Sequence, residues 1–194
     1  MLSPSPPPPP PPPTVEVAAA PRAPTPPAVS ATGPPGAFKL NLLVFNGSPF
    51  KDHWAFWIPT SRNPSFGVVI HAVGDVRHGF KFEVKRNLNI TLTNQRPTQI
   101  IPLQWVDGIF FDEAAMLNND VYRLDNKPVC AFEDSAYKAP APTKSLNAVD
   151  DVVTPGRPIS QRNCQTWIVE AAAHLVRDGI IAKEVADYLN AMKQ

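Results

Sequence analysis

The chain has 194 residues, a net charge of +1 and 18% charged residues, with no basic block or stripe. This balance gives no electrostatic case for nucleic-acid binding. No apolar run approaches the length of a membrane span, and prolines begin at Pro4, where a secretory signal would need an apolar helix. We therefore expect a cytoplasmic protein without a transmembrane segment, whose two cysteines stay reduced.

The amino-terminal part differs in composition from the rest. Residues 1–36 hold fifteen of the 25 prolines, with an unbroken run from Pro6 to Pro13. Such a run forms extended, solvated polyproline II and cannot bury a core. We expect 1–36 to be a disordered proline-rich tail and 37–194 to be one domain. The tail could bind SH3, WW or profilin-type grooves, although an unselective flexible extension is the simpler interpretation.

The predicted elements of the domain are strands first and helices last. Apolar or alternating runs predict strands at 38–45, 53–58, 67–74, 80–84 and 98–106. Pro102 restricts the last of these to a sheet edge or a bulge. Helices are expected at 111–117, 161–177 and 182–192, with a long loop over 133–158. This order indicates an α+β fold, an antiparallel sheet packed against C-terminal helices.

Cys164 stands where the strongest helical pattern begins. Behind it, apolar residues recur at helical spacing, at Ile168, Ala171, Ala172 and Leu175, and Gly179 follows as a stop. A thiol in the first turn feels the positive end of the helix dipole, which favours the thiolate. The backbone N–H of Cys164 or the side chain of Gln161 could donate to an oxyanion, and Asn163 could cap the helix.

Two histidines are predicted to share one face of a hairpin. If the second and third strands pair with Ile58 opposite Phe66, His53 comes opposite His71 on an otherwise apolar face. Packing the start of the Cys164 helix against that face would unite a thiol, a base and a second histidine that orients the base.

The segments His53-Trp-Ala-Phe-Trp-Ile, Val69-Ile-His71 and Asn163-Cys164-Gln165, in this order, resemble the circularly permuted papain-like fold. The similarity, over about Leu40 to Gly179, is to the lecithin retinol acyltransferase and HRAS-like suppressor group. NlpC-type and PPPDE desumoylating peptidases share that fold, and a fungal lineage has a similar layout. The resemblance implies Cys164 as nucleophile, His53 as general base and His71 as the orienting residue. Gln165-Thr166 replaces the Glu-His of the lipid enzymes, which weighs against a lipid substrate.

Two functions from different classes follow. The first is a cysteine-dependent acyl-transfer enzyme, a hydrolase or acyltransferase, that needs no cofactor and acts on an ester, thioester or amide of a small molecule, lipid or peptide. The second is a catalytically inactive papain-like interaction protein with a proline-rich tail. In that case Cys164 is a small buried apolar residue and His71 a core histidine. A zinc site with Cys130 lacks paired ligand spacing, so we expect no metal.

Overall fold

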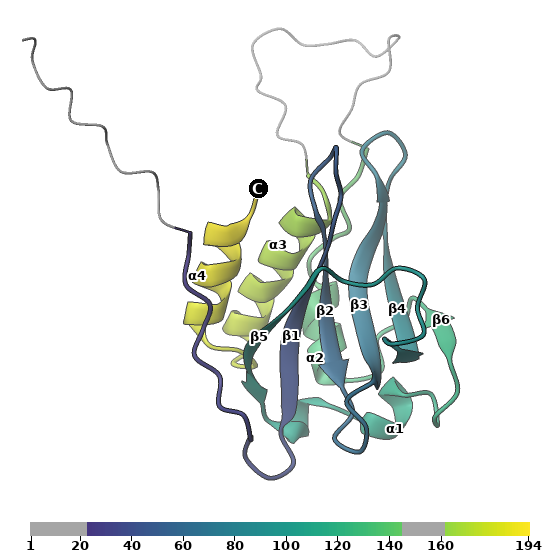
Figure 1. Ribbon diagram of the computed structural model, residues 1–194, viewed down its shortest axis with the longest axis vertical. Coiled ribbons are helices and arrows are strands. Elements are labelled where there is room, and N and C mark those ends of the chain that lie inside the picture. Colours follow the sequence, from purple (N-terminus) through teal and green to yellow (C-terminus); the bar gives the residue numbers. More distant parts are fainter. Residues whose placement is uncertain (1–22, 145–161) are drawn as a thin grey trace, which may run out of the picture.

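The computed structural model describes residues 23–144 and 162–194 (Figure 1). Its strands are β1 (Phe38–Phe45), β2 (His53–Pro59), β3 (Phe66–Asp75), β4 (Gly79–Asn89), β5 (Gln99–Val106) and β6 (Arg123–Asp125). Its helices are η1 (Gly108–Phe110), α1 (Glu113–Met116), α2 (Ala131–Tyr137), α3 (Cys164–Arg177) and α4 (Lys183–Met192). The expected α+β class, with an antiparallel sheet and C-terminal helices, is confirmed. None of the described helices is both long and apolar enough to span a bilayer.

The six strands form one antiparallel sheet in the order β5-β1-β2-β3-β4-β6. β5 is an edge strand, and Pro102 pairs with Asn41 beside a register shift between Leu40 and Asn41. This agrees with the prediction that Pro102 requires an edge or a bulge, because proline cannot donate to a ladder. β6, a strand of three residues at the other edge, was not predicted.

The hairpin of β2 and β3 has a register two residues away from the predicted one. Ile58 pairs with Val68, and Thr60 N–H donates to Phe66 O at 2.8 Å. The turn is therefore centred on Asn63, whose carbonyl accepts from the Thr60 hydroxyl (3.0 Å) and from Phe66 N–H (2.9 Å). A shift of two residues changes the cross-strand partner of each residue. It leaves each side chain on the same face of the sheet, because side chains alternate with a period of two.

The first half of β2 separates from β3. Pairing with β1 continues to Phe45 opposite His53, whereas pairing with β3 ends at Phe56 opposite Ile70. Backbone groups alternate between the two sides of a strand, and Thr60 N–H points to β3. The backbone groups of the even-numbered residues Asp52 and Trp54 therefore face the gap between the separated strands.

The two faces of the sheet are covered by different elements (Figure 1). Helices α2, α3 and α4 pack on one face, which we call the helix face. Its core includes the fully buried Trp54, Phe56, Phe132 and Trp167. The other face holds a smaller cluster of Leu43, Ala55, Trp57 and Val69, and the β4–β5 connection crosses it. We call this the loop face.

The predicted packing of α3 against the histidine-bearing face is wrong. The apolar stripe of α3, with Ile168, Ala172 and Leu175, belongs to the helix-face core. That side of β2 offers the larger apolar surface, since Trp54 and Phe56 both point to it. Burial of the largest apolar area decides which face a helix covers.

The expected loop over 133–158 is also corrected in part. Residues 133–137 belong to α2, whose Glu133 is fully buried and accepts from Arg86 at 2.9 and 3.0 Å. Residues 145–158 of that prediction lie outside the described residues.

Part of the proline-rich segment lies against β5. Trp105 Nε1 donates to Ser30 O at 3.0 Å, and a side chain at Gly33 would collide with the Trp105 ring. The domain division at residue 36 stays a prediction.

Candidate active site

Three side chains on neighbouring strands form a hydrogen-bonded row. His53 Nε2 lies 2.8 Å from His71 Nδ1, and His71 Nε2 lies 3.2 Å from Glu83 Oε1. β2 supplies His53, β3 supplies His71, and Glu83 stands directly opposite His71 on β4. The structure therefore brings the two predicted histidines together on the loop face and adds a carboxylate to them.

The hydrogen bonds along this row determine which ring nitrogens of the two histidines are protonated. The hydrogen bond from His71 lowers the pKa of Glu83, so the carboxylate is ionised and accepts from His71 Nε2–H. Burial lowers the pKa of His71, so its ring is neutral and Nδ1 is left to accept. His53 Nε2–H must then be the donor, and the remaining lone pair of His53 is on Nδ1. Burial, followed by the neighbouring His71 ring and the charge of Lys85, lowers the pKa of His53 to about 4.

Cys164 is the first residue of α3, at a firmly capped helix start. The Asn163 side chain accepts from Thr166 N–H at 3.1 Å, and the Thr166 hydroxyl accepts from Asn163 N–H in return. This capping box confirms Asn163 as the cap. It fixes the backbone that presents the thiol. Gln161, the other expected oxyanion donor, lies outside the described residues.

The thiol of Cys164 lies in the gap between β2 and β3. Its Sγ donates to Asp52 O over 3.9 Å and is also in hydrogen-bonding reach of Trp54 N–H. The fully buried Gln165 holds α3 there, because its Nε2 donates to Asp52 O at 2.9 Å. Cys164 thus contacts the backbone on both sides of His53, while its helix covers the opposite face of the sheet.

The thiol is not poised as a thiolate, in contrast to the expectation from its helix position. Burial raises the pKa of Cys164, and the backbone N–H groups of Trp54, Gln165 and Cys164 itself only partly oppose this. Desolvation of the sulfur therefore outweighs the helix start. Within the described residues, the hydrogen bonds of Cys164 include neither imidazole.

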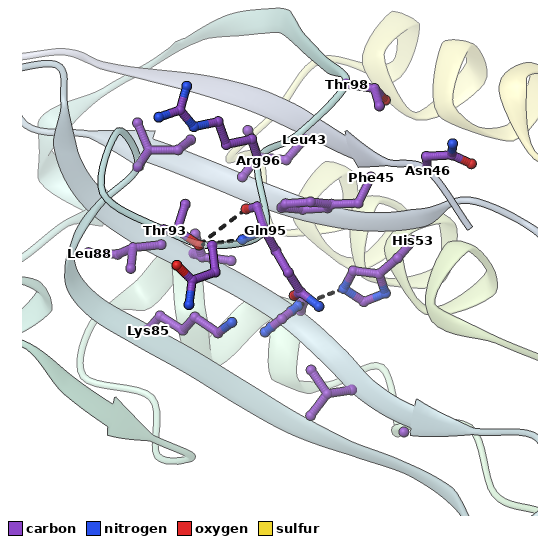
Figure 2. A pocket seen from close by; sticks show the side chains of 16 residues that line it. Leu43, Phe45, Asn46, His53, Lys85, Leu88, Thr93, Gln95, Arg96 and Thr98 are labelled. Carbon is purple, nitrogen blue, oxygen red and sulfur yellow. Dashed lines mark hydrogen bonds between the residues drawn. The ribbon is translucent and has the colours of Figure 1, made fainter. Parts of the chain in front are cut away.

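A cavity of about 520 Å³ opens on the loop face beside the histidines. Strands β1 to β4 form its floor, and residues 93–96 and Thr98 of the β4–β5 connection form its other wall. Figure 2 shows His53 at one end of this cavity, with one ring nitrogen on the dashed line to His71 and the other facing away. His53 thus borders both the cavity and the gap that holds Cys164.

Comparison with protein families identifies the family of this chain. The family model of DUF6540, described as a family of unknown function, matches residues 40–182. The chain belongs to DUF6540. The matched part contains Cys164, His53, His71 and Glu83. No curated protein and no solved structure matches the chain.

The other reactive side chains lie apart from this row. Cys130 is buried in the helix-face core, and burial raises its pKa to about 11. His78 is exposed, and its Nδ1 lies 2.9 Å from Asp75. His174 is in the last turn of α3. Within 23–144 and 162–194, no three His, Cys, Asp or Glu side chains could hold a metal ion together.

Glu83 is the site residue that the sequence interpretation missed. The alternation around Phe82 and Val84 correctly gave a half-exposed strand and put Glu83 on its polar side. Only the register of β3 with β4 brings Glu83 opposite His71. The turn at Asp75–Gly79 could have predicted this register. Gly74 pairs with Phe80 across the turn, and the same register continues to His71 opposite Glu83.

Proposed function

We propose that this DUF6540 protein is a cysteine-dependent acyl-transfer enzyme of the circularly permuted papain-like type, a hydrolase or an acyltransferase for an ester, thioester or amide. The observation that supports this most is the place of the thiol. Cys164 lies against the backbone on both sides of His53, and His53 Nδ1, which makes no hydrogen bond to the described residues, is left to accept a proton.

The order of the elements also supports the papain-like relationship. The two histidine-bearing strands are the second and third elements, and the helix that begins with the cysteine comes late. This is the order that the sequence resemblance implied. The row from His53 through His71 to Glu83 has the logic of a catalytic triad, in which a third group fixes the tautomer of the base.

The acylation step begins from neutral partners. Because the pKa of Cys164 is raised and that of His53 is about 4, neither group is charged near neutral pH. As Sγ attacks the carbonyl carbon, its proton passes to His53 Nδ1. The backbone N–H of Cys164 donates to the oxyanion. Collapse breaks the bond to the leaving group, which takes the proton from Nδ1, and a thioester remains on Cys164.

The second step returns the enzyme to its starting state. A water, alcohol or amine gives its proton to His53 Nδ1 and attacks the thioester carbonyl. The carbon–sulfur bond breaks, and the Cys164 sulfur recovers the proton. During both steps the imidazolium of His53 is stabilised through His71 by the ionised Glu83.

The proposal is tested with p-nitrophenyl acetate, by following nitrophenolate release and acetylation of the protein by mass spectrometry. Cys164→Ser should abolish acetylation at this site. His53→Ala should slow it by about 10²- to 10⁴-fold, the usual contribution of a general base. His71→Ala should slow it less, because His71 orients the base and transfers no proton from the thiol.

Matched controls use the remaining residues of the same types. Cys130→Ser and His78→Ala should acetylate at the wild-type rate, since neither residue belongs to the row. Equal acetylation of wild type and His53→Ala would contradict the proposal.

Equal acetylation of the two proteins would favour the alternative function, a catalytically inactive interaction protein. The burial of Cys164 and its raised pKa are the observations on that side. A cytoplasmic location and recognition of the proline tract by SH3, WW or profilin-type domains stay predictions from the sequence in either case.

A further inference from the structure

The lining of the loop-face cavity separates into an apolar floor and a cationic part. The floor residues come from β1, β3 and β4 and from the start of the β4–β5 connection, namely Leu43, Phe45, Val69, Val73, Leu88 and Ile90. The cationic residues are Lys85 on β4 and Arg96 in the connection. The described lining includes neither aspartate nor glutamate.

Both cations have unused capacity. Lys85 Nζ lies 3.9 Å from Glu83 Oε1, at the long limit of an ion pair, and its side chain is 28% exposed. Arg96 uses one nitrogen to donate to Thr91 O at 3.3 Å, and its other N–H donors have no partner among the described residues. His53 and His71 are neutral and the ionised Glu83 lies outside the lining, so the residues that line the cavity have a net positive charge.

We infer that this cavity binds a small amphipathic anion, with an apolar chain on the strand floor and a carboxylate or phosphate group held by Lys85 and Arg96. In Figure 2 the Arg96 side chain points away from Lys85, so this exposed side chain turns toward the cavity when the anion binds. A volume of about 520 Å³ is in the range of small-molecule sites, which combine an apolar lining with a few polar groups. Guanidinium groups suit carboxylate and phosphate geometry because they donate two parallel hydrogen bonds.

Neutral donors complete the recognition of the anion. The connection contributes Asn94, Gln95 and Thr98 to the lining. In Figure 2 the side chain of Gln95 runs from the connection toward His53. A ligand in the cavity would therefore contact His53 from the loop face. This inference does not depend on the proposed reaction, since Cys164 is absent from the lining.

Calorimetric titration of the full chain with octanoate tests the inference. The Cys164→Ser variant is used, so that failure of acyl transfer cannot affect the result. Octanoate should bind at low salt and bind more weakly at high salt, as expected for screened charges. Octanol should bind about tenfold more weakly, because it lacks the charge that Arg96 and Lys85 pair with. Octyl phosphate in place of octanoate distinguishes a phosphate from a carboxylate ligand.

Substitutions test whether Arg96 and Lys85 bind the anion. Arg96→Gln and Lys85→Met should each weaken binding about tenfold, the cost of losing one charged hydrogen bond. Arg77→Gln and Lys81→Met remove the same charges from exposed positions outside the lining and should bind like the parent. Arg96 is in an exposed connection, so its variant tests the inference even if Lys85→Met folds poorly.

A second readout comes from the histidine. The Lys85 charge lowers the pKa of His53, so a bound anion should raise the NMR-detected pKa of His53. Equal binding of octanol and octanoate, wild-type affinity in both cation variants, or no binding of either anion would overturn the inference.

Discussion

The two faces of the sheet differ in how they use buried space. The helix face is filled by aromatic and aliphatic side chains, and the charge that it buries, Arg86, is matched by Glu133 and Asp125 at 2.9 Å each. The loop face has a small apolar cluster, a cavity and two neutral histidines. Dense packing on one face provides stability, whereas incomplete packing on the other leaves an open cavity beside two histidines.

The strongest test of the helix face breaks its buried ion pair. Arg86 is 1% exposed and Glu133 is fully buried, so Arg86→Met leaves a buried carboxylate without a cationic partner, with the Val129 N–H as a remaining donor at 2.9 Å. We expect the free energy of unfolding to fall by about 3–5 kcal/mol, as measured by urea denaturation. Arg123→Met removes an exposed arginine opposite Arg86 in the register and should change stability by less than about 0.5 kcal/mol. Similar losses in the two variants would contradict the assignment of Arg86 as a buried ionic centre.

Adjacent leucines on β1 compare the faces directly. Leu42 and Leu43 are both fully buried, but Leu42 belongs to the helix-face core and Leu43 lines the cavity. Leu42→Ala should cost about 3–5 kcal/mol, and Leu43→Ala about 2 kcal/mol, because fewer packed atoms surround a side chain beside existing empty space. Urea denaturation of both variants measures the difference. A larger loss for Leu43→Ala would show that the loop face is the better packed one.

Low pH should lower the free energy of unfolding through the two histidines of the loop face. In the unfolded chain His53 binds a proton below about pH 6.5, whereas the folded pKa is about 4. The unfolded state therefore binds more protons in this window, and stability falls as the pH drops from 6.5 to 4, by up to about 3 kcal/mol. The lowered pKa of His71 acts in the same direction. Unfolding of His53→Gln at pH values across this window should depend less on pH. His78→Gln, at an exposed position, should keep the wild-type slope.

A change at the edge of the sheet should have the smallest effect. Deletion of residues 1–36 removes the carbonyls of Ser30, Ala31 and Pro34, which accept from Trp105, Lys39 and Ala37, and leaves both faces intact. The expected loss is about 1–2 kcal/mol, because exposed hydrogen bonds each contribute at the low end of their usual range. Thermal denaturation of the shortened chain measures it. A fall in melting temperature well beyond a few degrees would mean that this segment is part of the folded unit.

Local patterns were enough to predict β1 to β5, α3 and α4. Alternation and helical periodicity can be recognised from consecutive residues alone. The prediction that His53 and His71 share a face was correct despite a two-residue error in register, because alternation preserves the face. α2 and β6 escaped prediction because Arg86, distant in sequence, holds both through Glu133 and Asp125. The face chosen by α3 also depended on the whole molecule, since only the sum of apolar surface on each side of β2 decides it.

The separation of β2 from β3 has a consequence for hydrogen exchange. The amide of Ile58 lies in a continuous ladder with β3, so its exchange requires the two strands to part. The amide of Trp54 instead faces the gap where α3 begins, next to the Cys164 sulfur. Its protection factor therefore reports the docking of α3, a smaller opening than unfolding of the sheet. Two amides of one strand thus report separately on the opening of the sheet and on the undocking of the helix that bears the thiol.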